Sequence, residues 1–456
     1  MTIRQTLITL LLLGGILTAG AQSFDTFFDG RNLRLDYIFA GNNAGQHIFF
    51  EKAYSTPQWA GRRARLTEVP LRGNGQISLR DHDSGELLFV HTFSTLFQEW
   101  QVTEEATHVS RAFQTCYNVP MPRRKVDVSV TLMDTHGKVT GQLTHAIDPA
   151  DILIRELGSN GIPHYTVWKG KGPTLASNID LAIIAEGYTR QQMGKFYHDC
   201  QRTVDALFAH EPFASLKEHF NVVAVAAESV DDGPSIPHQH QWSLTPLGTH
   251  YDTFYSQRYL MTQDMHRVYD VLADVPFEQV IILVNSDVYG GGGIYNQVNV
   301  FSSDHPTFPQ VLVHEFGHGY AGLGDEYFND DSFESLYPAD TEPWEPNLTT
   351  LVDFPSKWAD MLPKGTPIPT PPSKDVPNYR HIQNAQQQQL LDAATQRVGV
   401  FEGGGYQSKG VYRPAQECRM KVNEVSHFCP VCTRAIRRIT DFYTGQETND
   451  SSTGKP

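Results

Sequence analysis

The residues best suited to do chemistry lie in one stretch, Val311 to Phe328, which reads VLVHEFGHGYAGLGDEYF. His314 and His318 stand four positions apart, so an α-helix would present both imidazoles on the same face. Two imidazole nitrogens, each about 2.1 Å from the metal, are what a catalytic zinc ion takes from such a helix. Glu315 would then lie beside the metal, where it can act as general base on a zinc-bound water. The pattern predicts a zinc hydrolase, and two ordinary surface histidines on a helix are the alternative.

A third protein ligand is required if the zinc ion is to keep one open position for catalysis. Gly322 and Gly324 interrupt the predicted helix and allow the chain to turn back, because glycine adopts positive φ without steric cost. This turn can return a carboxylate to the metal. Asp325 is the predicted third ligand, and Glu326 is the alternative.

The spacing resembles the extended zinc motif of the metzincin peptidases, with one difference. The glycine and the third ligand of that motif would fall on Ala321 and Gly324. In this chain the matching residues come one position later, at Gly322 and Asp325. Metzincins also place a methionine in a tight turn beneath the zinc. Met420 is the candidate for that position, and ordinary core packing is the alternative.

Longer strings extend the resemblance to one family. HEFGHGYAGLGDEY, CRMKVN, FCPVC and IDLAIIAEGYT are similar to the IgA peptidase family of bacterial metallopeptidases, over the whole mature chain. The resemblance implies zinc-dependent endopeptidase activity, with His314 and His318 as zinc ligands and Glu315 as the catalytic residue. It also implies a β-rich domain before the peptidase domain. The family name reports immunoglobulin A as the substrate of some members.

Two further features are candidates for handling a substrate. Tyr327 and Tyr412 could stabilise negative charge on a substrate carbonyl oxygen, since a phenol can donate to it, and aromatic packing is their alternative. The alternating segment Ile294–Val300 predicts an edge strand ahead of the helix. Its residues Asn296 to Asn299 could pair with an extended substrate backbone, and an ordinary sheet edge is the alternative.

The elements that must position these residues divide into two regions. Residues 22–157 contain short alternating runs separated by turns, which predict an N-terminal antiparallel β-sandwich. These runs are Leu33–Phe39, Gln76–Arg80, Leu87–Phe93 and Val126–Leu132. Residues 158–456 alternate strands and helices and predict a metzincin-like α/β zinc peptidase domain. We therefore expect an α+β, multidomain fold.

Within the second region, three apolar runs predict buried strands, and two segments predict helices. The strands are Asn178–Ala185, Phe220–Ala227 and Glu278–Asn285; the helices are Arg190–Ala209 and the one that starts near Pro309. Residues 340–389 are rich in proline, glutamine and other polar residues and predict a long irregular insertion.

Composition limits the partners. The chain has 456 residues, of which 40% are hydrophobic, and a formal net charge of −15. Such a chain can bury a sizeable core, and it offers no basic face for nucleic acid. We expect a protein or peptide substrate and no nucleic-acid partner, and the sequence leaves the oligomeric state open.

Residues 1–21 have the order of a secretory signal peptide. Arg4 supplies a positive charge, Leu7 to Leu17 form an apolar run, and Ala19 to Ala21 offer small residues for cleavage. The run is too short for a comfortable membrane span, so we expect export without stable membrane insertion. The predicted location is the periplasm, the cell surface or the extracellular space, and a buried N-terminal helix is the alternative.

Five cysteines are few for an exported chain of this length, so disulfides are not its main source of stability. Cys429 and Cys432 form a Cys-x-x-Cys pair, which could be half of a structural zinc site, but no second such pair completes it. A disulfide between Cys418 and either residue of the pair is equally open.

Two other functions compete with an exported zinc endopeptidase. One is a surface or secreted binding protein in which the β-rich domain attaches to a partner and the metal site is vestigial. An intact Glu315 argues against it, because loss of this residue is the simplest route to an inactive site. The other is a narrow-specificity zinc exopeptidase or amidase.

Overall fold

A computed structural model describes residues 24–328 and 336–446 of the chain. The predicted signal peptide, residues 1–21, lies outside the described residues. Among the helices within those ranges, none combines the length and the apolar character that a membrane span requires.

The N-terminal part is built on two four-stranded sheets. The first has the order β5 (Arg111–Pro122), β1 (Phe28–Asn42), β2 (Gly45–Thr56) and β8 (Arg155–Glu156). The second has the order β4 (Leu87–Phe93), β3 (Gly75–Asp81), β6 (Val126–Met133) and β7 (Val139–Ile147). Strand β6 alternates strictly between buried and half-buried residues, as expected when one face of a sheet covers a core. Apolar residues of both sheets, with the short helices α1 (Phe24–Phe27) and α2 (Leu96–Gln101), form one buried cluster.

The second part is organised around a six-stranded sheet. Its order is β13 (Gly291–Ile294), β14 (Val298–Ser302), β12 (Gln279–Val284), β10 (Ile179–Glu186), β11 (Phe220–Val225) and β9 (His164–Trp168). The four central strands are parallel, and the two edge strands, β13 and β9, run antiparallel to their neighbours. Every residue of β10 and β12 is buried, as is typical of parallel strands covered on both faces.

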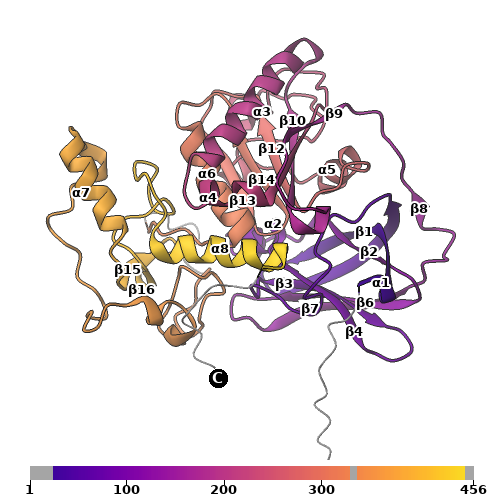
Figure 1. The fold of residues 1–456 in the computed structure, drawn as a ribbon, viewed down its shortest axis with the longest axis horizontal. Helices are drawn as coiled ribbons and strands as arrows, with labels where there is room; N and C mark the ends of the chain where they lie inside the picture. The colour runs from indigo at the N-terminus through magenta and orange to yellow at the C-terminus, as the bar shows by residue number, and fades with distance from the viewer. Residues whose placement is uncertain (1–23, 329–335, 447–456) are drawn as a thin grey trace, which may run out of the picture.

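Helices cover the two faces of this sheet unequally. Apolar residues of α3 (Met193–Phe208), α4 (Phe213–Leu216), α6 (Phe308–Ala321) and α8 (Pro430–Thr444) form one cluster with one face. Helix α5 (Met265–Val271) and buried residues between 236 and 261 pack on the other. Figure 1 shows α3 and α6 beside the sheet, with α8 running along its lower end.

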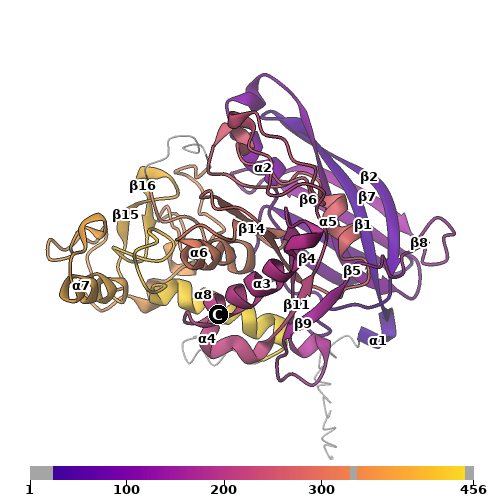
Figure 2. The same cartoon turned by 90° about the horizontal axis from the view of Figure 1, so that it is seen from above.

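The segment after α6 is mostly irregular, as the sequence predicts for residues 340–389. It contains the 3₁₀ turns η8 (Phe354–Ser356), η9 (Ala359–Met361) and η10 (Tyr379–His381), then helix α7 (Ala385–Thr395) and the hairpin β15 (Phe401–Gly404) and β16 (Gln407–Arg413). In both Figure 1 and Figure 2, this hairpin and α7 lie at the opposite end of the molecule from β1 and β2.

Buried polar contacts join the N-terminal sheets to the second part. The guanidinium of Arg34 binds Asp36 through two hydrogen bonds of 2.7 and 2.8 Å and also donates to Asp270 of α5. The amide of Gln297 donates to Thr115 and Tyr117 on β5. Because removing one partner would leave buried polar groups unpaired, these contacts tie the two parts together.

One predicted strand differs from the structure. Residues 294–300 do not form a single edge strand, because Asn296 has φ of 54° and turns the chain back. Val298 begins the fully buried strand β14, which lies inside the sheet. The edge next to α6 is instead β13, whose sequence is mostly glycine. The alternation of apolar and polar residues across 294–300 gave no sign that a turn at Asn296 separates two strands.

Candidate active site

Helix α6 positions the predicted catalytic residues. Pro309 occupies its first turn, where a missing N–H costs nothing, and Gly322 ends it in the left-handed conformation with φ of 60°. One face of the helix is buried against the core through Leu312, Phe316 and Tyr320. The opposite face turns His314, Glu315 and His318 toward a cavity of 740 Å³.

The turn after the helix brings a carboxylate to the two imidazoles. The Oδ1 atom of Asp325 lies 3.1 Å from Nε2 of His314 and 3.3 Å from Nε2 of His318. The two Nε2 atoms are 3.0 Å apart. Two imidazole nitrogens and one carboxylate oxygen pointing at a common centre match the donor set of a catalytic zinc site, so the residues present fit such an ion.

Backbone carbonyls fix the orientation of both rings. Nδ1 of His314 lies 3.0 Å from the carbonyl oxygen of Arg419, and Nδ1 of His318 lies 2.5 Å from that of Leu323. Because a carbonyl only accepts, each Nδ1 carries the proton of the neutral ring, and each Nε2 keeps its lone pair for a metal.

The charges of the three groups favour each other. Burial alone raises the pKa of Asp325, but the two imidazoles hold that pKa well below its usual value. Burial alone lowers the pKa of His318, but the Asp325 and Glu315 carboxylates raise it to about 9. Histidine binds a metal ion only through an unprotonated nitrogen, so the affinity of this group for a cation should fall with decreasing pH.

The loop that delivers Asp325 is held from several sides. The Tyr406 hydroxyl donates a 2.6 Å hydrogen bond to Oδ2, the oxygen that faces away from the histidines. The buried Asn347 side chain accepts from the Gly324 N–H at 2.7 Å and donates to the Gly324 carbonyl at 2.9 Å. Neither residue was predicted from sequence, since each lies far along the chain and neither belongs to a recognisable spacing.

Glu326, the alternative third ligand, points elsewhere. Its Oε1 atom lies 3.2 Å from Sγ of Cys432, and its side chain is fully buried. The structure thus brings Asp325, and not Glu326, to the histidines. Successive side chains along an extended segment point to opposite sides. This accounts for the different directions of the Asp325 and Glu326 carboxylates.

Met420 lies against the active-site helix. A Cβ built on Gly317 would come within 2.9 Å of its Sδ atom, so this close approach requires glycine in α6. The Met420 carbonyl also accepts a 2.8 Å hydrogen bond from the Glu326 N–H. The methionine turn and the loop carrying Asp325 therefore support each other directly.

Glu315 faces the cavity next to the glycine-rich edge strand. A Cβ on Gly291 would approach its Oε1 to 3.0 Å, and a Cβ on Gly293 would come within 2.4 Å of its backbone carbonyl. Glycine in β13 is what lets this strand pass so close to α6. Burial raises the pKa of Glu315, although the neighbouring histidines act in the opposite direction.

The N-terminal part contributes to the same space. Glu99 of α2 lines both the 740 Å³ cavity and an adjoining cavity of 290 Å³, and it accepts a hydrogen bond from Tyr259. Burial raises the pKa of Glu99 to about 7, against the opposing effect of Tyr259. Sequence gave no signal for Glu99, because the strands that bring α2 to the cavity pair over long distances.

The two tyrosines predicted as substrate-binding candidates lie in different places. Tyr327 lines the larger cavity, and the Arg258 guanidinium lies 5.6 Å from the centre of its ring. Tyr412 lies on β16 and packs against the main hydrophobic cluster instead. Among the described residues, Tyr327 is thus the one of the pair that can meet a substrate in this cavity.

Comparison with known families assigns both parts of the chain. The family described as IgA Peptidase M64 matches residues 169–440, and the family described as Peptidase M64 N-terminus matches residues 23–144. A comparison with curated proteins finds no match. The first match spans more than half of the chain and contains the histidine pair, Asp325 and Met420. The family predicted from the sequence is thereby confirmed: the chain belongs to the IgA peptidase M64 family and is a peptidase.

Proposed function

We propose that this peptidase is an exported, zinc-dependent endopeptidase that hydrolyses internal peptide bonds of protein substrates. The observation that supports it most is the convergence of His314, His318 and Asp325 at the wall of an open cavity, with Glu315 facing the same space. Export rests on the signal-peptide pattern of residues 1–21.

In this proposal, different residues of the chain carry out different steps of the hydrolysis. A zinc ion held by His314, His318 and Asp325 would polarise the scissile carbonyl and increase the acidity of water. The Glu315 carboxylate accepts the proton of the attacking water and then delivers it to the departing amine nitrogen. Burial raises the pKa of Glu315, which favours uptake of the proton from water.

Stabilising the developing negative charge falls to Tyr327 and Arg258. Both side chains line the larger cavity, and the Arg258 Nη2 donates to the Tyr327 hydroxyl at 3.5 Å. A phenol and a guanidinium are donors that can bind an oxyanion. Tyr406 is committed to Asp325 and acts as a positioning residue.

The shape of the site favours an endopeptidase over an exopeptidase. The two cavities, of 740 and 290 Å³, share His318, Asp325 and Glu99 and are otherwise lined mostly by different residues. Two adjoining cavities that meet at these residues offer room for a substrate chain that continues past them. An exopeptidase needs a group that closes one side and binds a chain terminus.

The N-terminal region, residues 22–157, forms an antiparallel β-sandwich in this proposal and shapes one wall of the substrate site. Its residues Asn74, Gln98 and Glu99 line the smaller cavity, beside Tyr295 and Trp344 of the second part, residues 158–456. We assign it a role in substrate binding, and it follows that the metzincin-like domain is incomplete without it.

A peptide-library digest tests the proposal. Purified protein is incubated with a diverse peptide mixture, with and without a chelator, and the products are read by mass spectrometry. Internal cleavage that stops with chelator and returns with zinc is expected; release of single terminal residues, or no cleavage, would overturn the endopeptidase assignment. Immunoglobulin A is included as a separate substrate, because the family description names it.

A further inference from the structure

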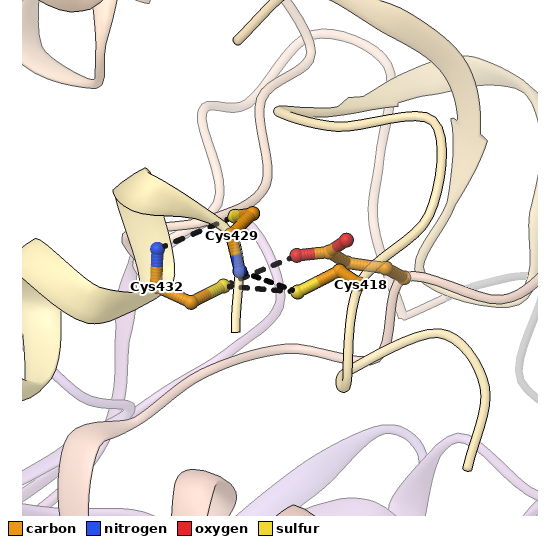
Figure 3. A group of neighbouring side chains, drawn as sticks. Cys418, Cys429 and Cys432 are labelled. Carbon is orange, nitrogen blue, oxygen red and sulfur yellow. Dashed lines mark hydrogen bonds between the residues drawn. The ribbon is translucent and has the colours of Figure 1, made fainter. Parts of the chain in front are cut away.

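A second group of side chains of the types that bind metal ions lies next to the Asp325 loop. Cys418, Cys429 and Cys432 approach one another at the N-terminus of α8, as Figure 3 shows. Glu326 completes the group, and one ligand atom from each of the four residues lies within 4.8 Å of the others. All four side chains are fully buried, and none of the cysteines forms a disulfide.

The sulfur spacing fits a shared ion. Sγ of Cys418 and Sγ of Cys432 are 3.9 Å apart. A disulfide would hold two sulfurs at about 2.05 Å. Tetrahedral zinc with Zn–S bonds of about 2.3 Å places its sulfurs about 3.8 Å from each other. The Glu326 Oε1 atom, 3.2 Å from Sγ of Cys432, supplies a fourth corner.

Backbone donors point at the sulfurs. The Cys429 N–H donates to Sγ of Cys418 at 3.3 Å, and the Cys432 N–H donates to Sγ of Cys429 at 3.5 Å. Such bonds, at the positive end of the α8 dipole, favour thiolates over neutral thiols. On the opposite side, Oε2 of Glu326 is buried and has no hydrogen-bond partner among the described residues. An unpaired buried carboxylate oxygen is costly unless a cation accompanies it.

The geometry points to a structural zinc site with Cys418, Cys429, Cys432 and Glu326 as its four ligands. Sequence shows only the Cys-x-x-Cys half, because the other two ligands come from separate segments that tertiary structure brings in. Buried Arg413 supplies positive charge near Glu326, which offsets part of the surplus negative charge of three thiolates and a carboxylate around one divalent ion. Lys421 also lies nearby but is paired with Glu417 at 2.8 Å.

This second site would brace the first. Glu326 directly follows Asp325, and its N–H donates to the carbonyl of Met420. Cys418 directly precedes Arg419, whose carbonyl accepts the Nδ1 proton of His314. An ion joining these segments fixes both the third catalytic ligand and the orientation of one histidine, as groups behind a metal's ligands commonly do.

Metal analysis combined with zinc X-ray absorption on the full chain tests the assignment. Wild type should contain about two zinc ions per chain, and the double variant His314→Ala/His318→Ala should keep about one. The zinc that remains in this variant should show sulfur neighbours at about 2.3 Å. Conversely, Cys418→Ser/Cys432→Ser should retain about one ion with only nitrogen and oxygen neighbours. Cys200→Ser, a buried cysteine in α3, is the matched control and should keep both ions.

The histidine variant keeps the test decisive even if the cysteine variant fails to fold. A wild type with one zinc ion that vanishes in the histidine variant would overturn the assignment. So would an intact mass, measured without reductant, that shows two hydrogens lost to a disulfide among these three cysteines. Failure of the catalytic proposal alone would look different, since the sulfur-bound ion would remain while peptide cleavage was absent.

Discussion

The hydroxyl of Tyr406 donates a 2.6 Å hydrogen bond to Oδ2 of Asp325, while Oδ1 of the same carboxylate lies 3.1 Å from Nε2 of His314. One oxygen is thus held by the hairpin turn between β15 and β16, and the other is left to face the two imidazoles. The tyrosine fixes the rotation of the carboxylate and therefore the direction in which Oδ1 points.

Tyr406→Phe should weaken zinc binding by about 10- to 100-fold, the usual effect of losing a partner that orients a metal ligand. Competitive chelator titration measures it. Tyr412→Phe removes a hydroxyl of the same kind from a neighbouring tyrosine that lies outside the cavity and should leave zinc affinity unchanged. Equal affinities for wild type and Tyr406→Phe would show that the loop alone positions Asp325.

Gly293→Ala should disable the site although Gly293 is not itself a predicted ligand. The added Cβ would lie 2.4 Å from the Glu315 carbonyl and 3.0 Å from Cβ of His318, so the strand and helix must separate. Overpacking of this kind lowers the free energy of unfolding by about 1–3 kcal/mol. Because the displacement of α6 also moves the groups that carry out catalysis, kcat/KM in a peptide-cleavage assay should fall far more than the loss of folded protein explains. Gly194→Ala in α3, where a Cβ meets nothing within 4 Å, is the control and should keep full activity. Full activity in Gly293→Ala would mean that the edge strand adjusts freely.

Local spacing predicted the helix that carries His314, Glu315 and His318, and their position on one side of it, for a physical reason. His314, Glu315 and His318 depend only on helical periodicity, and the turn that returns Asp325 depends on glycines next to it in sequence. The strand predicted at Asn178–Ala185 is present as β10, Ile179–Glu186, because parallel strands buried on both faces are continuously apolar.

Contacts between distant segments could not be predicted in this way. Strand β5 was missed, and Tyr406, Glu99 and Cys418 reach their partners only through the tertiary fold. The strand predicted at residues 294–300 failed for a related reason, since a single positive-φ residue, Asn296, divides a run that alternates without interruption.

Asp180→Asn should stabilise the protein at neutral and higher pH. Burial raises the pKa of Asp180 from its ordinary 3.8 to about 7, although a hydrogen bond from Asn221 opposes the shift. Between these values the folded state holds more protons than the unfolded state, so wild type loses stability as pH rises from about 4 to 7. The amide is free of this loss, and the variant's advantage should grow over that window to on the order of 4 kcal/mol.

Urea denaturation of both proteins at pH 4, 5.5 and 8 measures the Asp180→Asn difference. An advantage that is the same at all three values would show that Asp180 does not change protonation in this range. Asn221→Ala is a useful companion variant: loss of the hydrogen bond to Asp180 should raise the pKa of Asp180 further, so this variant should lose more stability than wild type as pH rises.

Deletion of residues 22–157 should abolish cleavage of short peptides as well as of folded proteins. The deletion removes Glu99 from the cavity and leaves buried Gln297 without Thr115 and Tyr117, so the second part loses both a wall and interior contacts. A truncated chain that still cleaved short peptides would show that the N-terminal part serves only to dock large substrates.

The most direct test of the account is Glu315→Gln, measured for metal content and for peptide hydrolysis on the same sample. The amide preserves the shape of the side chain but cannot accept the proton of the attacking water. The variant should bind zinc as wild type does, and its kcat should fall by at least about 10²- to 10⁴-fold, the usual contribution of a general base. A fully zinc-loaded Glu315→Gln protein that keeps most of the wild-type kcat would contradict the account.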